Sequence, residues 1–154
     1  MYKHILVPYD GSPASQKGLA EAIRLARDQQ ASLQVISVAE EYVLTQSAGL
    51  GGGAFIGEMM ETLAAETRKL VDEAVSQAKS QGVEAFGTAI ESLTSRPSDC
   101  VVEAARAWPA DLIVMGTHGR RGISRMVMGS DAEMVLRSAE VPVLLIRAVT
   151  KNAA

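Results

Sequence analysis

Residues 5–13 read Ile-Leu-Val-Pro-Tyr-Asp-Gly-Ser-Pro, and this stretch sets the fold class. Its first three residues form a continuous apolar run, which predicts a strand buried on both faces. Asp10 and Gly11 end the run, and Ser12-Pro13 supplies a helix cap and a proline that fits a first helical turn. Apolar residues then recur at helical spacing, which predicts a helix over Pro13–Gln29.

The same alternation of apolar patterns continues along the chain. Further strands are predicted over Leu33–Val38, Val83–Ile90, Leu112–Met115 and Pro142–Ile146, and further helices from Met60 to near Gly82, over Ser98–Trp108 and over Ser130–Ser138. Such alternation implies a parallel sheet with helices on both faces. With the first strand in the centre, we expect an α/β fold. It would be a doubly wound, open five-stranded parallel sheet flanked by four helices, in strand order 3-2-1-4-5.

Two segments are expected to depart from this regular core. Thr45–Gly57 is rich in glycine, which costs backbone entropy in any regular element, so we expect a flexible loop there. The strand predicted over Val83–Ile90 carries charge at Glu84 and is followed by Glu91. Charged residues of this kind suit a strand at the edge of a sheet.

The chain has 154 residues, a length typical of one domain of about 100–200 residues. We expect a single domain over residues 1–154, with 148–154 as a flexible tail. The 15 lysines and arginines against 18 aspartates and glutamates give a net charge of -3, which argues against nucleic-acid binding. One cysteine and two distant histidines, His4 and His118, argue against an intramolecular disulfide and a cysteine- or histidine-rich metal centre.

Neither a targeting segment nor a membrane span is expected. The apolar run at the start turns polar at Asp10, too early for the core of a signal peptide. The longest apolar stretches lie around Leu112–Met115 and Val141–Ile146, and both are far shorter than the roughly 18 residues of a membrane span. We therefore expect a cytoplasmic protein.

An unusual segment follows the strand that ends at Met115. Gly116 and Gly119 leave the strand, nine residues intervene, and Gly129-Ser130 opens a helix. Glycines let a backbone approach a ligand closely and adopt positive φ, and free N–H groups at a helix start attract phosphate. Open α/β sheets bind ligands beyond the carboxyl ends of their strands, where the strand order reverses. The spacing and its place in the fold favour a phosphate site.

The same segment also has a purely structural interpretation. Glycine after a strand is ordinary turn chemistry, and Ser130–Glu133 fits a capping box that needs no ligand. Against this, Arg120, Arg121 and Arg125 place positive charge in the segment, although the chain as a whole is negative.

Three motifs together resemble the universal stress protein family, over almost the whole chain from Tyr2 to Arg147. Gly116-x2-Gly119-x9-Gly129-Ser130 is similar to the nucleotide-binding signature of that family. Residues 5–12 resemble its opening strand, and Val141–Ile146 resembles its closing strand. The resemblance implies a homodimeric regulator of the stress response that binds ATP, with Mg²⁺ or Mn²⁺ held mainly by the phosphates.

The resemblance also implies which residues would bind the nucleotide. They lie at the end of the first strand, in the second strand, at the end of the fourth strand and in the glycine segment. The base and sugar would meet Pro8, Asp10, Val35, Met115 and Gly116, and the phosphate side would be formed by Gly119, Arg120, Gly129, Ser130 and Asp131. No residue is assigned as a metal ligand or as a catalytic group.

Several of these residues have other interpretations. Asp10 is typical of a turn before Gly11, and Val35 and Met115 fit a core equally well. Asp131 stands where the family commonly has a small apolar residue, often valine. Its carboxylate suits a first helical turn but would repel terminal phosphates, unless it meets a phosphate-bound cation. Two alternatives stay open: a nucleotide-independent dimeric interaction module, and a site that prefers AMP or cyclic AMP.

The sequence offers little support for an enzyme. It lacks the Gly-x4-Gly-Lys-Ser/Thr loop of phosphoryl transfer, and no serine–histidine–acid order stands out. By family analogy, slow ATP hydrolysis or autophosphorylation remains open. Cys100 is expected to be a buried, inert thiol. His118 is expected either to donate to an anion or to be an exposed loop histidine.

The closing strand predicts how two chains would meet. Residues 143–146 are apolar and form the last strand of an open sheet. Pairing two such edges across a twofold axis would remove an exposed edge. The strand is a usual dimer contact in the family, so we expect a homodimer through Val141–Arg147. A regulatory protein partner, of unknown identity, is expected as well.

Overall fold

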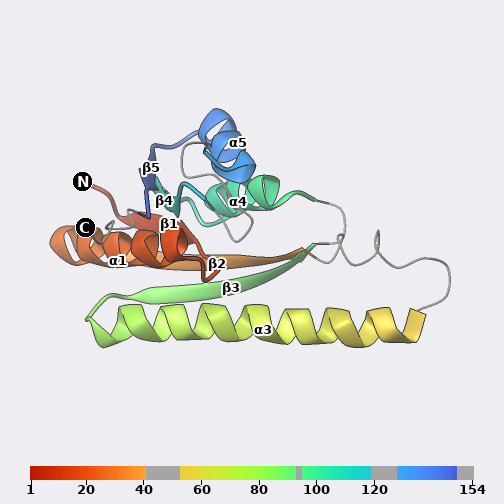
Figure 1. The fold of residues 1–154 in the computed structure, drawn as a ribbon. Coiled ribbons are helices and arrows are strands. Elements are labelled where there is room, and N and C mark those ends of the chain that lie inside the picture. The colour runs from red at the N-terminus through yellow and green to blue at the C-terminus, as the bar shows by residue number, and fades with distance from the viewer. Residues whose placement is uncertain (41–52, 93–94, 119–127, 149–154) are drawn as a thin grey trace, which may run out of the picture.

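The computed structural model describes residues 1–40, 53–92, 95–118 and 128–148 (Figure 1). Strands and helices alternate along the chain as β1 His4–Pro8, α1 Pro13–Gln29, β2 Ser32–Glu40, α3 Gly53–Ser80, β3 Ala85–Ser92, α4 Pro97–Ala107, β4 Leu112–Gly116, α5 Ser130–Ser138 and β5 Val143–Ile146. Within the described ranges the strands form one parallel sheet in the order β3-β2-β1-β4-β5. The predicted α/β fold and strand order are confirmed.

The sheet separates two apolar clusters because successive side chains of a strand point to opposite faces. Ile5 and Val7 of β1 join the cluster that includes Leu19 of α1 and residues of α3. Leu6 points the other way and joins the cluster that includes Val101 of α4 and Val135 of α5. The three β1 residues are fully buried, which confirms the strand predicted to be covered on both faces.

One sequence expectation about the glycine-rich region is wrong. We expected a loop over Thr45–Gly57, but residues 53–57 belong to α3, which runs for 28 residues. The rest of that expected loop, 45–52, lies outside the described residues. A helical glycine costs only about 1 kcal/mol relative to alanine, and extending an existing helix adds a hydrogen bond for each residue. The prediction from glycine content therefore placed the start of α3 too late in the sequence.

Among the described strands, β3 pairs with β2 alone, so it lies at the edge of the sheet. This confirms the edge position that was predicted from its charged residues. Its central Gly87 allows α3 to lie directly on the strand. A Cβ at Gly87 would come within 2.4 Å of Val71 Cγ1 and 2.8 Å of Val75 Cγ2. Any side chain at this position would separate the helix from the sheet.

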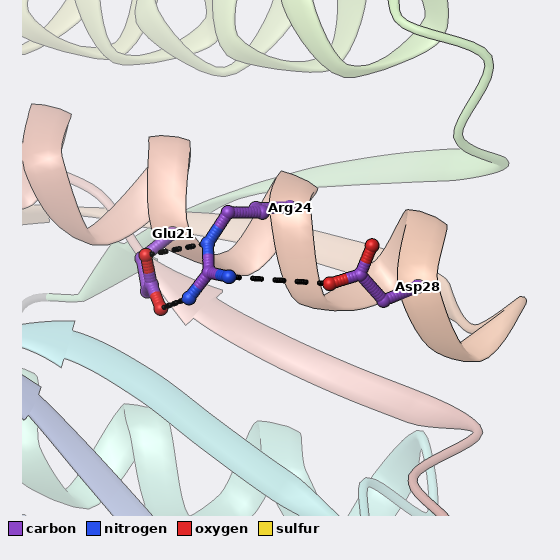
Figure 2. Close-up of polar contacts among 3 residues, drawn as sticks. All are labelled: Glu21, Arg24 and Asp28. Atoms are coloured by element: carbon purple, nitrogen blue, oxygen red, sulfur yellow. Dashed lines mark hydrogen bonds and ion pairs between the residues drawn. The ribbon is translucent and has the colours of Figure 1, made fainter.

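The outer face of α1 carries a small network of charges, drawn in Figure 2. The guanidinium of Arg24 donates two hydrogen bonds to Glu21, one of them from Nε to Oε2 at 3.2 Å. Its Nη1 lies 4.0 Å from Asp28 Oδ2. The hydrogen bond from Arg24 lowers the pKa of the Glu21 carboxyl. These residues line the side of α1 that faces away from the sheet (Figure 2).

Candidate functional site

The strand order reverses between β1 and β4. From β1 the chain continues through α1 to β2 on one side, and from β4 it continues through α5 to β5 on the other. The segments that follow the carboxyl ends of these two strands are in contact, since Ser12 Oγ donates to the carbonyl of His118 at 3.4 Å. This is the place where open α/β sheets bind ligands.

The turn after β1 is organised by Asp10. Its Oδ1 accepts a hydrogen bond from the backbone N–H of Ser12 at 2.9 Å, and its own N–H donates to Ser15 Oγ at 3.4 Å. Gly11 between them has φ +77°, a conformation that favours glycine. The structural interpretation of Asp10 as a turn residue is therefore confirmed, and its contact with a nucleotide stays a prediction.

Helix α1 begins with a side-chain N-cap. Ser12 is the N-cap residue, and its Oγ accepts from the N–H of Ser15 at 3.2 Å. Pro13 follows in the first turn, where its missing N–H leaves no donor unsatisfied. The side chain of Gln16 adds a bond to the carbonyl of Gly11 at 3.0 Å. Residues of the chain thus cap the start of this helix without a ligand.

The end of β4 lies directly against α1. A Cβ at Gly116 would come within 2.8 Å of the Ala14 carbonyl carbon and within 2.9 Å of the Ser15 nitrogen. Close helix packing therefore explains the glycine at 116, whether or not a sugar lies beside it. Next to it, Met115 is 6% exposed, and Val35 in β2 is 0% exposed, so both side chains are core residues. That structural interpretation is confirmed for both.

Helix α5 begins differently from α1. Its N-cap is Gly129, which has no side chain that could accept a hydrogen bond from the first N–H groups. The capping box expected over Ser130–Glu133 is wrong, because the helix begins one residue earlier than that motif requires. Glu133 accepts from Arg137 Nη2 at 2.7 Å instead. Gly129 has φ -62°, so the positive φ expected of the motif glycines does not apply here.

The remaining predicted site residues fall into two groups. Ser130 and Asp131 are exposed in the first turn of α5, and Pro8 is half-buried at the end of β1. Gly119 and Arg120 lie outside the described residues, as do Arg121 and Arg125.

Two further expectations concern single side chains. Cys100 is a buried free cysteine, as expected, and burial raises the pKa of its thiol, which favours an inert role. His118 is half-buried, and its Nδ1 lies 2.9 Å from Thr117 Oγ1, so the exposed-loop interpretation is not supported. Among the described residues, no group of three or more His, Cys, Asp or Glu side chains could hold a metal ion.

Sequence reasoning missed Thr117. Its backbone carbonyl accepts from the N–H of Gly129 at 2.8 Å, and its own N–H donates to the carbonyl of Ile146 at 2.9 Å. A single threonine after a strand carries no signal in a sequence, because the hydrogen bonds that distinguish it depend on the tertiary fold.

Comparisons with known proteins agree with this architecture. A model of the universal stress protein family matches residues 1–147. A universal stress protein of Methanocaldococcus jannaschii is 32% identical over 152 residues, covering 99% of this chain and 86% of that protein. The solved structure of a universal stress protein from Lactobacillus plantarum has a TM-score of 0.80 at 25% identity, covering 95% of this chain and 98% of that one.

Some structures with this fold are complexes with adenine nucleotides. The dAMP complex of an Archaeoglobus fulgidus universal stress protein has a TM-score of 0.64 at 23% identity, covering 94% of this chain and 98% of that one. An Arabidopsis thaliana family protein with AMP bound has a TM-score of 0.70 at 15% identity, covering 99% and 95%. A further universal stress protein is in complex with cAMP. The family match and the sequence identity together show that this chain belongs to the universal stress protein family.

Proposed function

We propose that this chain binds an adenine nucleotide beyond the carboxyl ends of β1 and β4, with the phosphates at the start of α5. The observation that carries the proposal is the N-terminus of α5, whose N-cap residue Gly129 supplies no capping side chain and which begins beside the strand-order reversal. Uncapped N–H groups and the helix dipole favour an anion there. Family membership and the adenine nucleotides held by three proteins of the same fold support the choice of ligand.

The residues around this helix start suit such a ligand. Gly129 places no side chain beside the first N–H groups, and Ser130, which follows it, is exposed. Pro8 and Asp10 would form the wall for base and sugar, together with the neighbourhood of Gly116. Because the side chains of Val35 and Met115 are buried, we propose that these two residues contribute mainly through their backbone groups.

We propose ATP as the physiological ligand, with Mg²⁺ or Mn²⁺ held mainly by the phosphates. Asp131 favours a second candidate, a site for AMP or cyclic AMP, because its exposed carboxylate lies in the turn that would receive a polyphosphate. A cation between the carboxylate and the phosphates would remove this repulsion. ATP should then bind more tightly with Mg²⁺ than without it, whereas AMP should be insensitive to Mg²⁺.

Calorimetric titrations with ATP, AMP and cyclic AMP, each with and without Mg²⁺, would distinguish these ligands. The variant Gly129→Val should weaken binding at least about tenfold by placing a branched side chain beside the N–H groups at the start of α5, with an unchanged circular dichroism spectrum. Gly57→Ala is the matched control, because nothing lies within 4 Å of a Cβ at that exposed position. Wild-type affinity in Gly129→Val would refute the site. No binding of any of the three nucleotides by wild type would favour the nucleotide-independent module.

We further propose that the protein acts as a cytoplasmic homodimeric regulator rather than a metabolic enzyme. The edge strand β5 is apolar and only partly buried, which suits pairing through Val141–Arg147 with a second copy. Light scattering across a concentration series should give twice the mass of one chain, 16.3 kDa, and a constant monomer mass would contradict the dimer. A phosphate-release assay on the same samples tests slow hydrolysis.

A further inference from the structure

Thr117 connects three elements that surround the proposed nucleotide site. Although polar, it is only 5% exposed. Its N–H donates to the carbonyl of Ile146 at the end of β5, at 2.9 Å, and its carbonyl accepts from the N–H of Gly129 at 2.8 Å. One buried residue thus fixes the N-cap of α5 against the carboxyl end of the sheet.

The side chain of Thr117 extends this connection to α1. Its Oγ1 lies 2.9 Å from Nδ1 of His118, and the carbonyl of His118 accepts from Ser12 Oγ at 3.4 Å. Ser12 is the N-cap of α1, as Gly129 is of α5. The Thr117–His118 dipeptide therefore lies between the N-termini of α1 and α5 and is hydrogen-bonded to both. Both helix N-termini carry positive partial charge.

We propose that Thr117 is a positioning residue for the nucleotide site, and that its hydroxyl acts by fixing His118 between the starts of α1 and α5. The inference rests on the proposed function. When valine replaces Thr117, the backbone bonds to Gly129 and Ile146 can persist, and Ser12 Oγ still reaches the His118 carbonyl, but the imidazole loses its contact with Thr117 Oγ1. A nucleotide would then have to order the His118 side chain at the expense of affinity.

The first experiment needs no nucleotide. The chain contains two histidines, so their ring signals in ¹⁵N–¹H spectra are readily assigned. Thr117→Val should shift the ring signals of His118 and leave those of His4 unchanged, because His4 contacts Trp108 instead. Thr117→Ser keeps the hydroxyl and should retain the wild-type His118 signals. Unchanged His118 signals in Thr117→Val would overturn the inference.

The second experiment measures affinity for AMP and for ATP with Mg²⁺. Thr117→Val should weaken binding about three- to tenfold, the range expected for one hydrogen bond, and Thr117→Ser should restore it. The matched control is Thr88→Val on β3, which loses the hydrogen bond between Gln34 Nε2 and Thr88 Oγ1 at 3.0 Å on an exposed surface. That variant should bind with wild-type affinity.

A double-mutant cycle separates positioning from a general loss of stability. His118→Ala removes the same bond from its other partner, so it should weaken binding to a similar extent, and adding Thr117→Val to it should cost less than about twofold more. Fully additive losses, or wild-type affinity in Thr117→Val, would overturn the inference while leaving the nucleotide site intact. A wild-type chain that binds no nucleotide would instead refute the proposed function, and the positioning role with it.

Discussion

Helices α1 and α5 begin at the same end of the sheet with nearly the same backbone conformation, but only in α1 does the N-cap residue supply a capping side chain. The N-cap Ser12 has φ -66° and ψ 158°, and the N-cap Gly129 has φ -62° and ψ 148°. Ser12 accepts from the N–H of Ser15, whereas Gly129 has no side chain that could accept such a bond. Because a serine would fit the backbone at 129, the glycine there is not required by conformation.

This difference separates a structural helix start from one suited to a ligand. At the start of α1, Ser12 caps the helix, Pro13 has no N–H to satisfy, and the backbone packs against Gly116. This helix start therefore has a structural role. At the start of α5 the N–H of Gly129 donates to the carbonyl of Thr117, and the two residues that follow, Ser130 and Asp131, are exposed. An anion at α5 would accept the hydrogen bonds that the N-cap glycine has no side chain to accept.

The largest expected effect comes from forcing α1 away from β4. Gly116→Ala places a Cβ within 2.8 Å of the backbone of Ala14, which a side-chain rotation cannot relieve. We expect the free energy of unfolding to fall by about 1–3 kcal/mol, measured by urea denaturation. The control Gly57→Ala should raise it by about 0.5–1 kcal/mol, because an exposed helical glycine is replaced without a clash. Equal stabilities of the two variants would contradict the close approach.

A smaller effect is expected from making α1 resemble α5. Ser12→Ala removes the N-cap and the bond to the His118 carbonyl, so the free energy of unfolding should fall by about 1 kcal/mol. The control Ser80→Ala removes only an exposed bond to the carbonyl of Gln77 near the end of α3. It should change stability much less. A Ser12→Ala variant as stable as Ser80→Ala would show that the cap at α1 contributes little.

The converse change makes α5 resemble α1. Gly129→Asp introduces a capping carboxylate, which should stabilise the nucleotide-free protein by a few tenths of a kcal/mol. The same carboxylate occupies the proposed phosphate position, so nucleotide affinity should fall while the melting temperature rises. Gly129→Ala adds bulk without a cap or a charge, and it should lower affinity less. Stability and affinity that fall together in Gly129→Asp would argue against an open helix start.

The smallest effect is expected on the outer face of α1. Arg24→Ala removes exposed ion pairs with Glu21 and Asp28 (Figure 2), and such pairs contribute little. Since Arg24 lowers the pKa of Glu21 in the folded state, this contribution is present above the carboxyl's unfolded pKa and disappears as pH falls through its folded pKa. The difference in melting temperature between wild type and Arg24→Ala should therefore be slight at pH 7 and vanish at pH 3. A difference that grows toward pH 3 would contradict this sign.

The sequence predicted the elements of this fold well because their apolar periods are strong. The bounds Pro13–Gln29 of α1 and Ser130–Ser138 of α5 agree with those predicted. The start of α3 was wrong, since glycine content outweighed the helical pattern that follows Gly57. Helix caps were harder to predict. The motif at Ser130 fits a capping box with Ser130 as the N-cap, but in the structure the N-cap is Gly129, whose N–H donates to the carbonyl of Thr117.

The candidate site was only partly predictable for a related reason. The glycine spacing identified the region, and the resemblance supplied roles for residues such as Asp10 and Gly129. It did not show that Asp10 shapes its own turn, or that Gly116 is required by contact with Ala14. Thr117 could not be found, because its partners lie in segments that meet only after the sheet has formed.

The length of α3 has a consequence for local opening of the chain. Its 28 residues span about 42 Å, whereas the eight residues of β3 span only about 26 Å. The first turns of the helix therefore project beyond the strands that it covers (Figure 1). The sheet does not cover the amide protons of these first turns. They should therefore exchange with solvent orders of magnitude faster than the amide protons near Ala74, which is buried against the sheet. One continuous helix thus contains both a fraying end and a segment that opens only when the whole domain unfolds.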